Sequence, residues 1–239
     1  MKIVLRIRRF DPQTDREPHD EDYPVEAEPT ERILDALIRV KDEQDGSLCF
    51  RRSCGHGVCG SDAMIIAGAE RLACKTLVRD VAHEDGALIP VQPLRFLPVQ
   101  RDLMVDQAVF FQKFKLVKPF LINGEPVKEK ERTQSQAERA VFDDVTSCIL
   151  CGACYSSCPV LEKNTSYVGP AALVQAARFI FDSRDRGLPE RMSVLDGPDG
   201  ASACENHFNC TRVCPRGIKI TKNINATKRL LAKVKEGSA

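Results

Sequence analysis

The sequence predicts an α+β protein with two domains, a sheet-forming domain followed by a helical one. Two observations lead to this prediction: apolar and polar residues alternate near the N-terminus, and apolar residues recur at helical spacing after residue 102. A third observation concerns chemistry. Ten of the eleven cysteines fall into three spaced groups, and only Cys49 lies outside them. We expect the two domains to cover residues 1–101 and 102–239.

The first domain is predicted to be a mixed sheet with one helix. The expected strands are residues 2–10, 23–27, 64–67, 71–74 and 88–91. A turn at Asp11-Pro12 separates the first two strands, and the sheet ends near Pro98. Residues 33–38 carry apolar side chains at helical spacing, which predicts a helix directly before the first cysteine group.

The second domain is predicted to be helical. The residues expected on the apolar face of its first helix are Val105, Val109, Phe110, Phe114 and Val117. Ser135 and Glu138 match a capping box that starts a further helix. Pro170 begins another helix that runs to about Asp182, with proline at its first position. Since the second and third cysteine groups flank this helix, we expect them to meet in space.

Composition excludes several classes of protein. An apolar fraction of 43% with 29% charged residues is typical of a globular protein, and no run of about 18 apolar residues predicts a membrane span. The N-terminus alternates like a strand, unlike a signal peptide, so we expect an intracellular protein that begins at Met1. Lys and Arg number 35 against 34 Asp and Glu, which argues against a nucleic-acid partner. Closely spaced cysteines favour metal binding in a reducing cytoplasm over disulfides.

The first cysteine group matches the plant-type pattern for a [2Fe–2S] cluster, with one substitution. Soft thiolates bind iron–sulfur clusters, and the pattern C-x4-C-x2-C wraps a loop around two irons while a last cysteine arrives from elsewhere. Asp62 stands where the third cysteine is expected. The alternative is that Asp62 only caps the loop and Cys49 supplies the fourth thiolate. The preferred ligand set is Cys54, Cys59, Asp62 and Cys74.

The second and third groups resemble two halves of a two-cluster bacterial ferredoxin. In such modules the last cysteine of each run binds the other cluster. The crossed assignment predicts a [4Fe–4S] cluster on Cys148, Cys151, Cys154 and Cys214. It leaves only Cys158, Cys204 and Cys210 for the other site, which predicts a [3Fe–4S] cluster. Two alternatives are that His207 completes a four-iron cluster, and that the cysteines hold structural zinc.

No site for substrate chemistry is visible in the sequence. The four histidines lack metalloprotease spacing, and neither a nucleophile elbow nor a phosphate loop occurs. Three clusters without a reaction centre imply that the chain conducts electrons between sites on other chains. Residues 212–235 carry many basic side chains and no acidic one, so this stretch either docks near lipid headgroups or forms an ordinary solvated helix.

Four segments strongly resemble the iron–sulfur subunit of succinate dehydrogenase: RRSCGHGVCGSD at 51–62, SCILCGACYSSCPV at 147–160, GPAALVQAARFIFDSRD at 169–185 and the C-x5-C-x3-C-P run at 204–215. The resemblance covers essentially the whole chain. It implies an N-terminal β-grasp plant-type ferredoxin domain followed by a helical bacterial-ferredoxin-like domain. It also implies the same ligand positions for [2Fe–2S], [4Fe–4S] and [3Fe–4S] clusters, with aspartate at the Asp62 position as a family variant.

The resemblance implies a function within a larger enzyme, respiratory complex II of the tricarboxylic acid cycle. Electrons from succinate, oxidised at the FAD of a flavoprotein subunit, would pass through the three clusters to a membrane quinone. The chain would then be peripheral, held by integral-membrane anchor subunits at the cytoplasmic face of a bacterial inner membrane. Fumarate reductase has the same subunit plan and runs in reverse, and Asp62 favours succinate oxidation. A soluble multi-cluster ferredoxin, or the cluster subunit of another flavoprotein oxidoreductase, is the alternative.

The quinone pocket is where the chain departs from its family. Some members place tryptophans after the second CP pair to line that pocket, whereas this chain has no tryptophan and continues with residues 160–163 as VLEK. The remaining candidates for lining a quinone site are Pro159 and His207.

Overall fold

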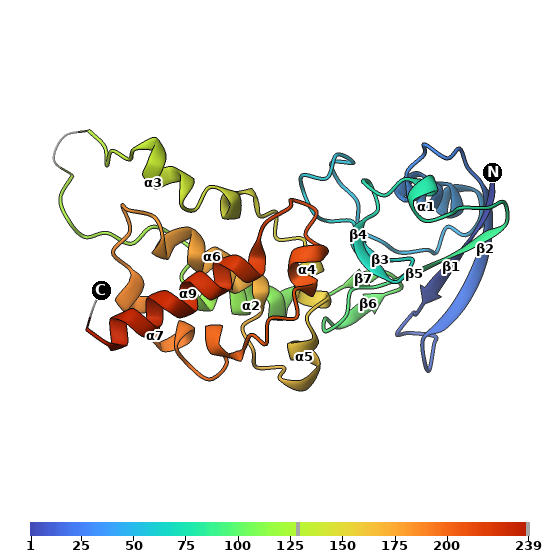
Figure 1. Ribbon diagram of the computed structural model, residues 1–239. Coiled ribbons are helices and arrows are strands. Elements are labelled where there is room, and N and C mark those ends of the chain that lie inside the picture. The colour runs from blue at the N-terminus through green and yellow to red at the C-terminus, as the bar shows by residue number, and fades with distance from the viewer. Residues whose placement is uncertain (128–129, 238–239) are drawn as a thin grey trace. The chain divides into compact units, whose positions relative to one another are not determined.

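A computed structural model describes residues 1–127 and 130–237, and these form two compact units (Figure 1). One unit, here called the sheet unit, comprises residues 1–107 together with 149–157. The other, the helical unit, comprises residues 108–148 and 158 onward. The chain therefore passes from one unit to the other at residues 107/108, 148/149 and 157/158. The domain limits 1–101 and 102–239 stay a prediction.

The sheet unit is built on a five-stranded mixed sheet, as the alternation predicted. The strand order is β2-β1-β5-β3-β4, and only the β1–β5 pair is parallel. Ile3, Leu5 and Ile7 of β1 are fully buried at alternate positions, so one face of the sheet forms the core. The elements of this unit are β1 Lys2–Arg9, β2 His19–Glu26, α1 Ile33–Arg39, η1 Val40–Gln44, β3 Ala63–Ile66, β4 Ala69–Leu72, η2 Val78–Asp80, β5 Ala87–Gln92, β6 Val99–Arg101, β7 Met104–Val105 and α4 Ala153–Ser156.

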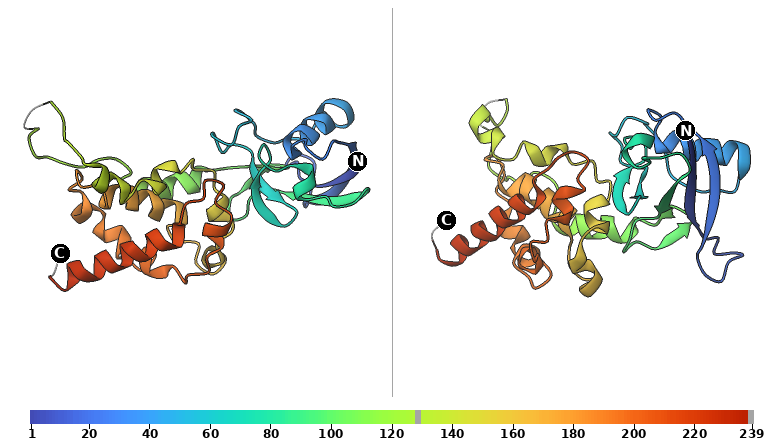
Figure 2. Two further views of the ribbon diagram at one scale, coloured as in Figure 1. Left: turned by 45° about the horizontal axis from the view of Figure 1, so that its top comes forward. Right: turned by 45° about the vertical axis from the view of Figure 1, so that its right-hand side comes forward.

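The helical unit contains the predicted helix beginning at a proline. The elements of this unit are α2 Ala108–Leu116, α3 Gln136–Ala140, η3 Asp144–Ser147, α5 Pro159–Lys163, α6 Pro170–Ile180, α7 Leu188–Leu195, η4 Ala201–Ala203, α8 Asn209–Arg212 and α9 Ile220–Lys235. α6 is buried along most of its length and packs against α9 (Figures 1 and 2). The capping box before α3 is also confirmed, since Glu138 N donates to Ser135 Oγ at 3.2 Å.

The prediction of a helix starting at residue 102 is wrong at its first residues. Asp102 adopts a positive φ of 45°, and the chain turns there so that β6 and β7 pair as a short hairpin. Val105 belongs to β7, and α2 begins only at Ala108. The hairpin is held by a distant residue, since Asp102 Oδ1 accepts from Arg9 Nε at 3.0 Å and from Phe10 N at 2.9 Å. The spacing of apolar residues along the chain cannot predict this contact between Arg9 and Asp102.

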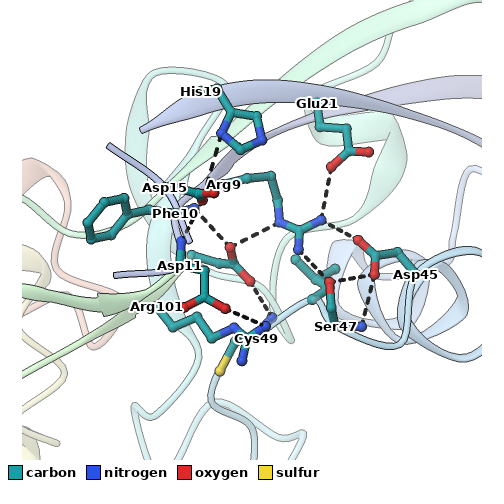
Figure 3. A network of polar contacts seen from close by, with 12 residues as sticks. Arg9, Phe10, Asp11, Asp15, His19, Glu21, Asp45, Ser47, Cys49 and Arg101 are labelled. Atoms are coloured by element: carbon teal, nitrogen blue, oxygen red, sulfur yellow. Dashed lines mark hydrogen bonds and ion pairs between the residues drawn. The ribbon is translucent and has the colours of Figure 1, made fainter. Parts of the chain in front are cut away.

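Arg9 is the centre of a buried ionic network in the sheet unit (Figure 3). It occupies the next inward position of β1 after Ile7 and is only 7% exposed. Its guanidinium donates to Asp102, Glu21, Asp45, Ser47 and the Tyr23 hydroxyl. Although burial opposes the charged form, hydrogen bonds from Ser47, Arg9 and Tyr23 hold the pKa of Asp45 well below its ordinary value. The network joins four separate segments of the unit.

Candidate functional site

The first cysteine loop connects the helical segment α1–η1 to β3, and its backbone points amide groups at a thiol. Gly55, Gly57 and Gly60 have φ values of 67°, 72° and 71°, a conformation that side-chain-bearing residues rarely adopt. The loop lets His56 N and Cys59 N donate to Cys54 Sγ at 3.3 and 3.4 Å. Hydrogen bonds from backbone amides, His56 first, lower the pKa of Cys54 to about 6. Cys54 is thereby a thiolate at neutral pH, the form that binds iron.

Asp62 and Cys74 lie together at the other side of this loop. Cys74 N donates to Asp62 Oδ2 at 2.6 Å, and Asp62 is only 2% exposed. Within the described residues, Asp62 Oδ1 is buried and has no hydrogen-bond partner. Burial, followed by the hydrogen bond and charge of Asp62, raises the pKa of Cys74 to about 12. A cation would satisfy the carboxylate oxygen and stabilise the Cys74 thiolate, so these residues fit an iron–sulfur cluster.

Cys49, the alternative fourth ligand, belongs to a different set of contacts. Its backbone N–H donates to Asp102 Oδ2 at 2.8 Å, and its carbonyl accepts from Leu103 N at 3.2 Å. It therefore lies in the Arg9 network (Figure 3). Asp62, by contrast, contacts Cys74 directly, and after burial its hydrogen bond and charge contribute most to the raised pKa of that cysteine.

The segment 149–157, which carries Cys151 and Cys154, packs within the sheet unit. A Cβ placed on Gly60 would lie 2.7 Å from Cys151 Cβ and 3.1 Å from the Ile149 carbonyl oxygen. Gly60 is thus required both for its backbone conformation and for a close approach of the first cysteine loop to the second motif. The far end of the segment is fastened by Ser156, whose Oγ donates to the buried Glu70 carboxylate at 2.9 Å.

Substituting Gly60 is expected to separate these two motifs. Gly60→Ala should destabilise the sheet unit by about 2–4 kcal/mol, since it combines overpacking against Cys151 with an unfavourable φ. Thermal unfolding and iron content per chain measure the effect. Gly68→Ala is the matched control, because Gly68 has a φ of 77° but nothing within 4 Å of its Cβ position. Equal losses in the two variants would contradict the role of the Cys151 contact.

Cys158, Cys204 and Cys210 line one pocket within the helical unit. The pocket encloses about 290 Å³, counting the part open to solvent, and its wall also includes Tyr167 and Thr221. Burial raises the pKa of Cys158, and the charges of Cys210 and Cys204 raise it further. Because burial and these neighbouring charges disfavour the Cys158 thiolate, a bound cationic group would stabilise it, so the residues fit a cluster.

The two quinone-site candidates lie in the wall of the same pocket. Pro159 is the first residue of α5, directly after Cys158. His207 Nε2 forms a hydrogen bond with Glu205 Oε2 at 2.8 Å, and the histidine side chain is 41% exposed. The imidazole is therefore paired with a carboxylate that also lines the pocket.

The four cysteines predicted to bind the four-iron cluster belong to different units. Cys148 and Cys214 belong to the helical unit, whereas Cys151 and Cys154 belong to the sheet unit. Their assignment to one cluster stays a prediction from their spacing. Among the described residues, no three His, Cys, Asp or Glu side chains are grouped so that they could hold one metal ion.

Two hydroxyl groups of the pocket were missed by the sequence analysis. Tyr167 is completely buried, and Thr221 Oγ1 lies 3.6 Å from Cys210 Sγ. Burial, together with the charges of the three thiolates, raises the pKa of Tyr167 far above its ordinary value, so its phenol remains protonated. No spacing rule links these residues to the cysteines, because they come from separate segments of the chain.

Two family models match the chain in the order of these sites. A 2Fe–2S iron–sulfur cluster binding domain matches residues 4–112, and a 4Fe–4S dicluster domain matches residues 144–218. The fumarate reductase iron–sulfur subunit of Mycobacterium tuberculosis (strain CDC 1551 / Oshkosh) is 38% identical over 96% of this chain and 96% of its own. The succinate dehydrogenase iron–sulfur subunit of Coxiella burnetii (strain RSA 493 / Nine Mile phase I) is 38% identical over 93% of this chain and 94% of its own.

The chain belongs to the succinate dehydrogenase/fumarate reductase iron–sulfur subunit family. A solved structure agrees: a chain of the Mycobacterium smegmatis Sdh1 complex in the apo form superimposes with a TM-score of 0.85 at 28% identity, covering 98% of this chain and 97% of that one. The predicted α+β fold class, the resemblance and the electron-transfer role are confirmed.

The comparisons also bear on the predicted cofactors and on the alternative of a soluble ferredoxin. The family models confirm a [2Fe–2S] and a [4Fe–4S] cluster domain. A freestanding ferredoxin is not favoured, because the relatives that match almost end to end are subunits of an oxidoreductase. None of the helices in residues 1–127 and 130–237 is both long enough and apolar enough to cross a membrane.

Proposed function

We propose that this subunit carries electrons from the FAD of a flavoprotein subunit to a membrane quinone in a succinate dehydrogenase. Bound iron–sulfur clusters accept and release single electrons, and the order would be [2Fe–2S], [4Fe–4S], [3Fe–4S]. The observation that carries the proposal is the pocket in which Cys158, Cys204 and Cys210 meet, with no fourth cysteine among its described lining residues. The contact of Gly60 with Cys151 supports it, since it brings the first cysteine loop against the second motif.

The proposal includes three ligand sets, of which the first and third are supported by contacts and the second by cysteine spacing. Asp62, with its orphaned buried oxygen, completes the first set alongside Cys54, Cys59 and Cys74. The proposed second set is Cys148, Cys151, Cys154 and Cys214. For the third set, the hydrogen bond from His207 to Glu205 and the exposure of His207 favour three thiolates alone over a fourth ligand from histidine.

Electron paramagnetic resonance of the air-oxidised protein tests the proposal. A [3Fe–4S] cluster is paramagnetic when oxidised, while ordinary oxidised two-iron and four-iron clusters are silent, so we expect one such signal per chain. If the iron content corresponds to three full clusters and this signal is absent, His207 is a ligand and the proposed third cluster is wrong. Co-purification with an FAD subunit and an integral-membrane anchor tests the proposed partners.

Asp62 is expected to tune the first cluster. Because a carboxylate is a harder ligand than a thiolate, Asp62→Cys should shift the [2Fe–2S] potential and spectrum while leaving the fold intact. Asp62→Ala should lower the content of this cluster. Cys49→Ala is the control and should change neither. The assignment is wrong if Asp62→Ala leaves the cluster unchanged while Cys49→Ala destroys it.

The proposed position at the cytoplasmic face of a bacterial inner membrane is supported by the charge of α9. Three of its exposed cations, Lys222, Arg229 and Lys233, are spaced by seven and four residues, so they share one face of the helix. Such a face suits anionic lipid headgroups beside the anchor. Unchanged membrane attachment after removal of the last turns of α9 would exclude this contribution. The proposed quinone contacts remain Pro159 and His207.

A further inference from the structure

Two buried hydroxyl groups lie in the pocket of Cys158, Cys204 and Cys210, and the electron-transfer role does not account for either. Tyr167 has no exposed surface, and its Oη makes no hydrogen bond of ordinary geometry within the described residues, although the thiolate of Cys204 acts on it as an acceptor. Thr221 is 1% exposed. A buried phenol without a partner costs about 1–3 kcal/mol, so native proteins rarely keep one without a function for it.

Tyr167 is held where it is by its own backbone. Its N–H donates to the Asn164 carbonyl oxygen at 3.2 Å, and its carbonyl accepts from the buried ammonium of Lys113 at 2.7 Å. Gly169 and Pro170 follow directly and begin α6. These contacts fix the backbone of Tyr167, and its completely buried side chain lies in the wall that the three cysteines share.

Thr221 is an example of a hydroxyl group that contacts a cysteine sulfur in this pocket. Its Oγ1 lies 3.6 Å from Cys210 Sγ and 3.0 Å from Thr211 Oγ1, and its N–H donates to Thr211 Oγ1 at 3.0 Å. A thiolate can only accept a hydrogen bond, so Thr221 must donate to Cys210 when Cys210 binds iron. Thr211 then donates to Thr221, and the three groups form a directed chain that ends on sulfur.

We propose that Tyr167 donates a hydrogen bond to a sulfur of the cluster held by Cys158, Cys204 and Cys210, and that Tyr167 and Thr221 together raise the reduction potential of that cluster. The inference rests on the proposed function, because it requires the third cluster. Reduction adds one negative charge, and a hydrogen bond donated to sulfur is stronger when the sulfur is more negative. The two hydroxyls therefore stabilise the reduced form more than the oxidised form.

A redox titration of the whole complex, followed by the three-iron resonance, tests the proposal. In Tyr167→Phe we expect the equilibrium constant for reduction to fall about tenfold, which lowers a one-electron potential by about 59 mV, with the signal amplitude retained. Thr221→Val should lower the potential in the same direction, and Thr221→Ser should restore it. Tyr23→Phe is the matched control, since it removes a buried phenol hydroxyl of the sheet unit, and it should leave this potential unchanged.

The outcomes separate the inference from the function on which it rests. Absence of the three-iron signal from the unmodified protein overturns the proposed third cluster. A full signal whose potential is the same in Tyr167→Phe and Tyr23→Phe overturns the role of Tyr167. Should Tyr167→Phe fail to assemble, the protein is grown with 3-fluorotyrosine, whose more acidic phenol is a stronger donor. The potential should then rise, and an unchanged potential overturns the inference.

Discussion

Replacing Cys158 by alanine is expected to abolish the proposed third cluster and leave the sheet unit with its own cluster intact. Cys158 is the residue of the second motif that lies in the pocket of the helical unit, and the other cysteines among the described residues of the pocket wall are Cys204 and Cys210. With two thiolates left, a three-iron cluster loses the ligand of one iron. The effect is a complete loss of the resonance of the air-oxidised protein, and electron delivery to quinone should stop with it.

The first cysteine loop provides the internal standard for this experiment. Its proposed ligands lie in the sheet unit, so the signal of the reduced [2Fe–2S] cluster should be retained in Cys158→Ala. Cys49→Ala removes a thiol that has no proposed ligand role and should preserve every signal. A three-iron resonance that survives in Cys158→Ala would show that the crossing of the two motifs has been assigned wrongly.

Replacing Arg9 by methionine is expected to destabilise the sheet unit by about 3–5 kcal/mol. Methionine keeps much of the volume but removes the guanidinium that, in the part of the chain the structure describes, pairs with Asp102, a carboxylate that is 1% exposed. Glu21 and Asp45 would also face each other without their shared cation. Because breaking a buried pair leaves charge without a partner, the loss exceeds the net contribution of the intact pair. Denaturant unfolding of the loaded protein measures it.

Arg6 is the control for Arg9 on the same strand. It points to the opposite face of β1, where its guanidinium binds both oxygens of Asp22 at 2.8 Å in an ion pair exposed to solvent. Exposed pairs contribute little to stability because water and salt screen them. Arg6→Met should therefore change the free energy of unfolding only slightly. A similar loss in both variants would mean that the buried network has no special role.

The sequence predicted well those features that depend on local pattern. Alternation located β1 and the neighbouring strands, and the proline at residue 170 marked the start of α6. Cysteine spacing grouped Cys158 with Cys204 and Cys210, three residues that the structure brings into one pocket. Each of these signals is contained in a short window or in a known spacing rule, so no knowledge of the tertiary fold was needed.

The features that sequence reasoning missed all depend on contacts between distant segments. Asp102 turns a hairpin because Arg9, ninety-three residues earlier, binds its side chain. The positions of Tyr167 and Thr221 beside the cysteines result from the packing of α6 against α9. Residues 149–157 contact the sheet unit at Gly60 and Glu70. The sequence around Gly60 and Glu70 does not predict either contact.

The placement of residues 149–157 in the sheet unit has a consequence for how the protein matures. A ribosome adds about 5–20 residues per second, so about 3–10 s pass between the synthesis of Gln107 and that of Ser157. During this interval the nascent sheet lacks the segment that packs on Gly60, and the Glu70 carboxylate lacks the hydroxyl of Ser156. We expect the side of the first cysteine loop that later faces Cys151 to be uncovered during this interval, so that iron and sulfide can reach it. Translation order thus favours loading of the first cluster before the second motif covers that side of its loop.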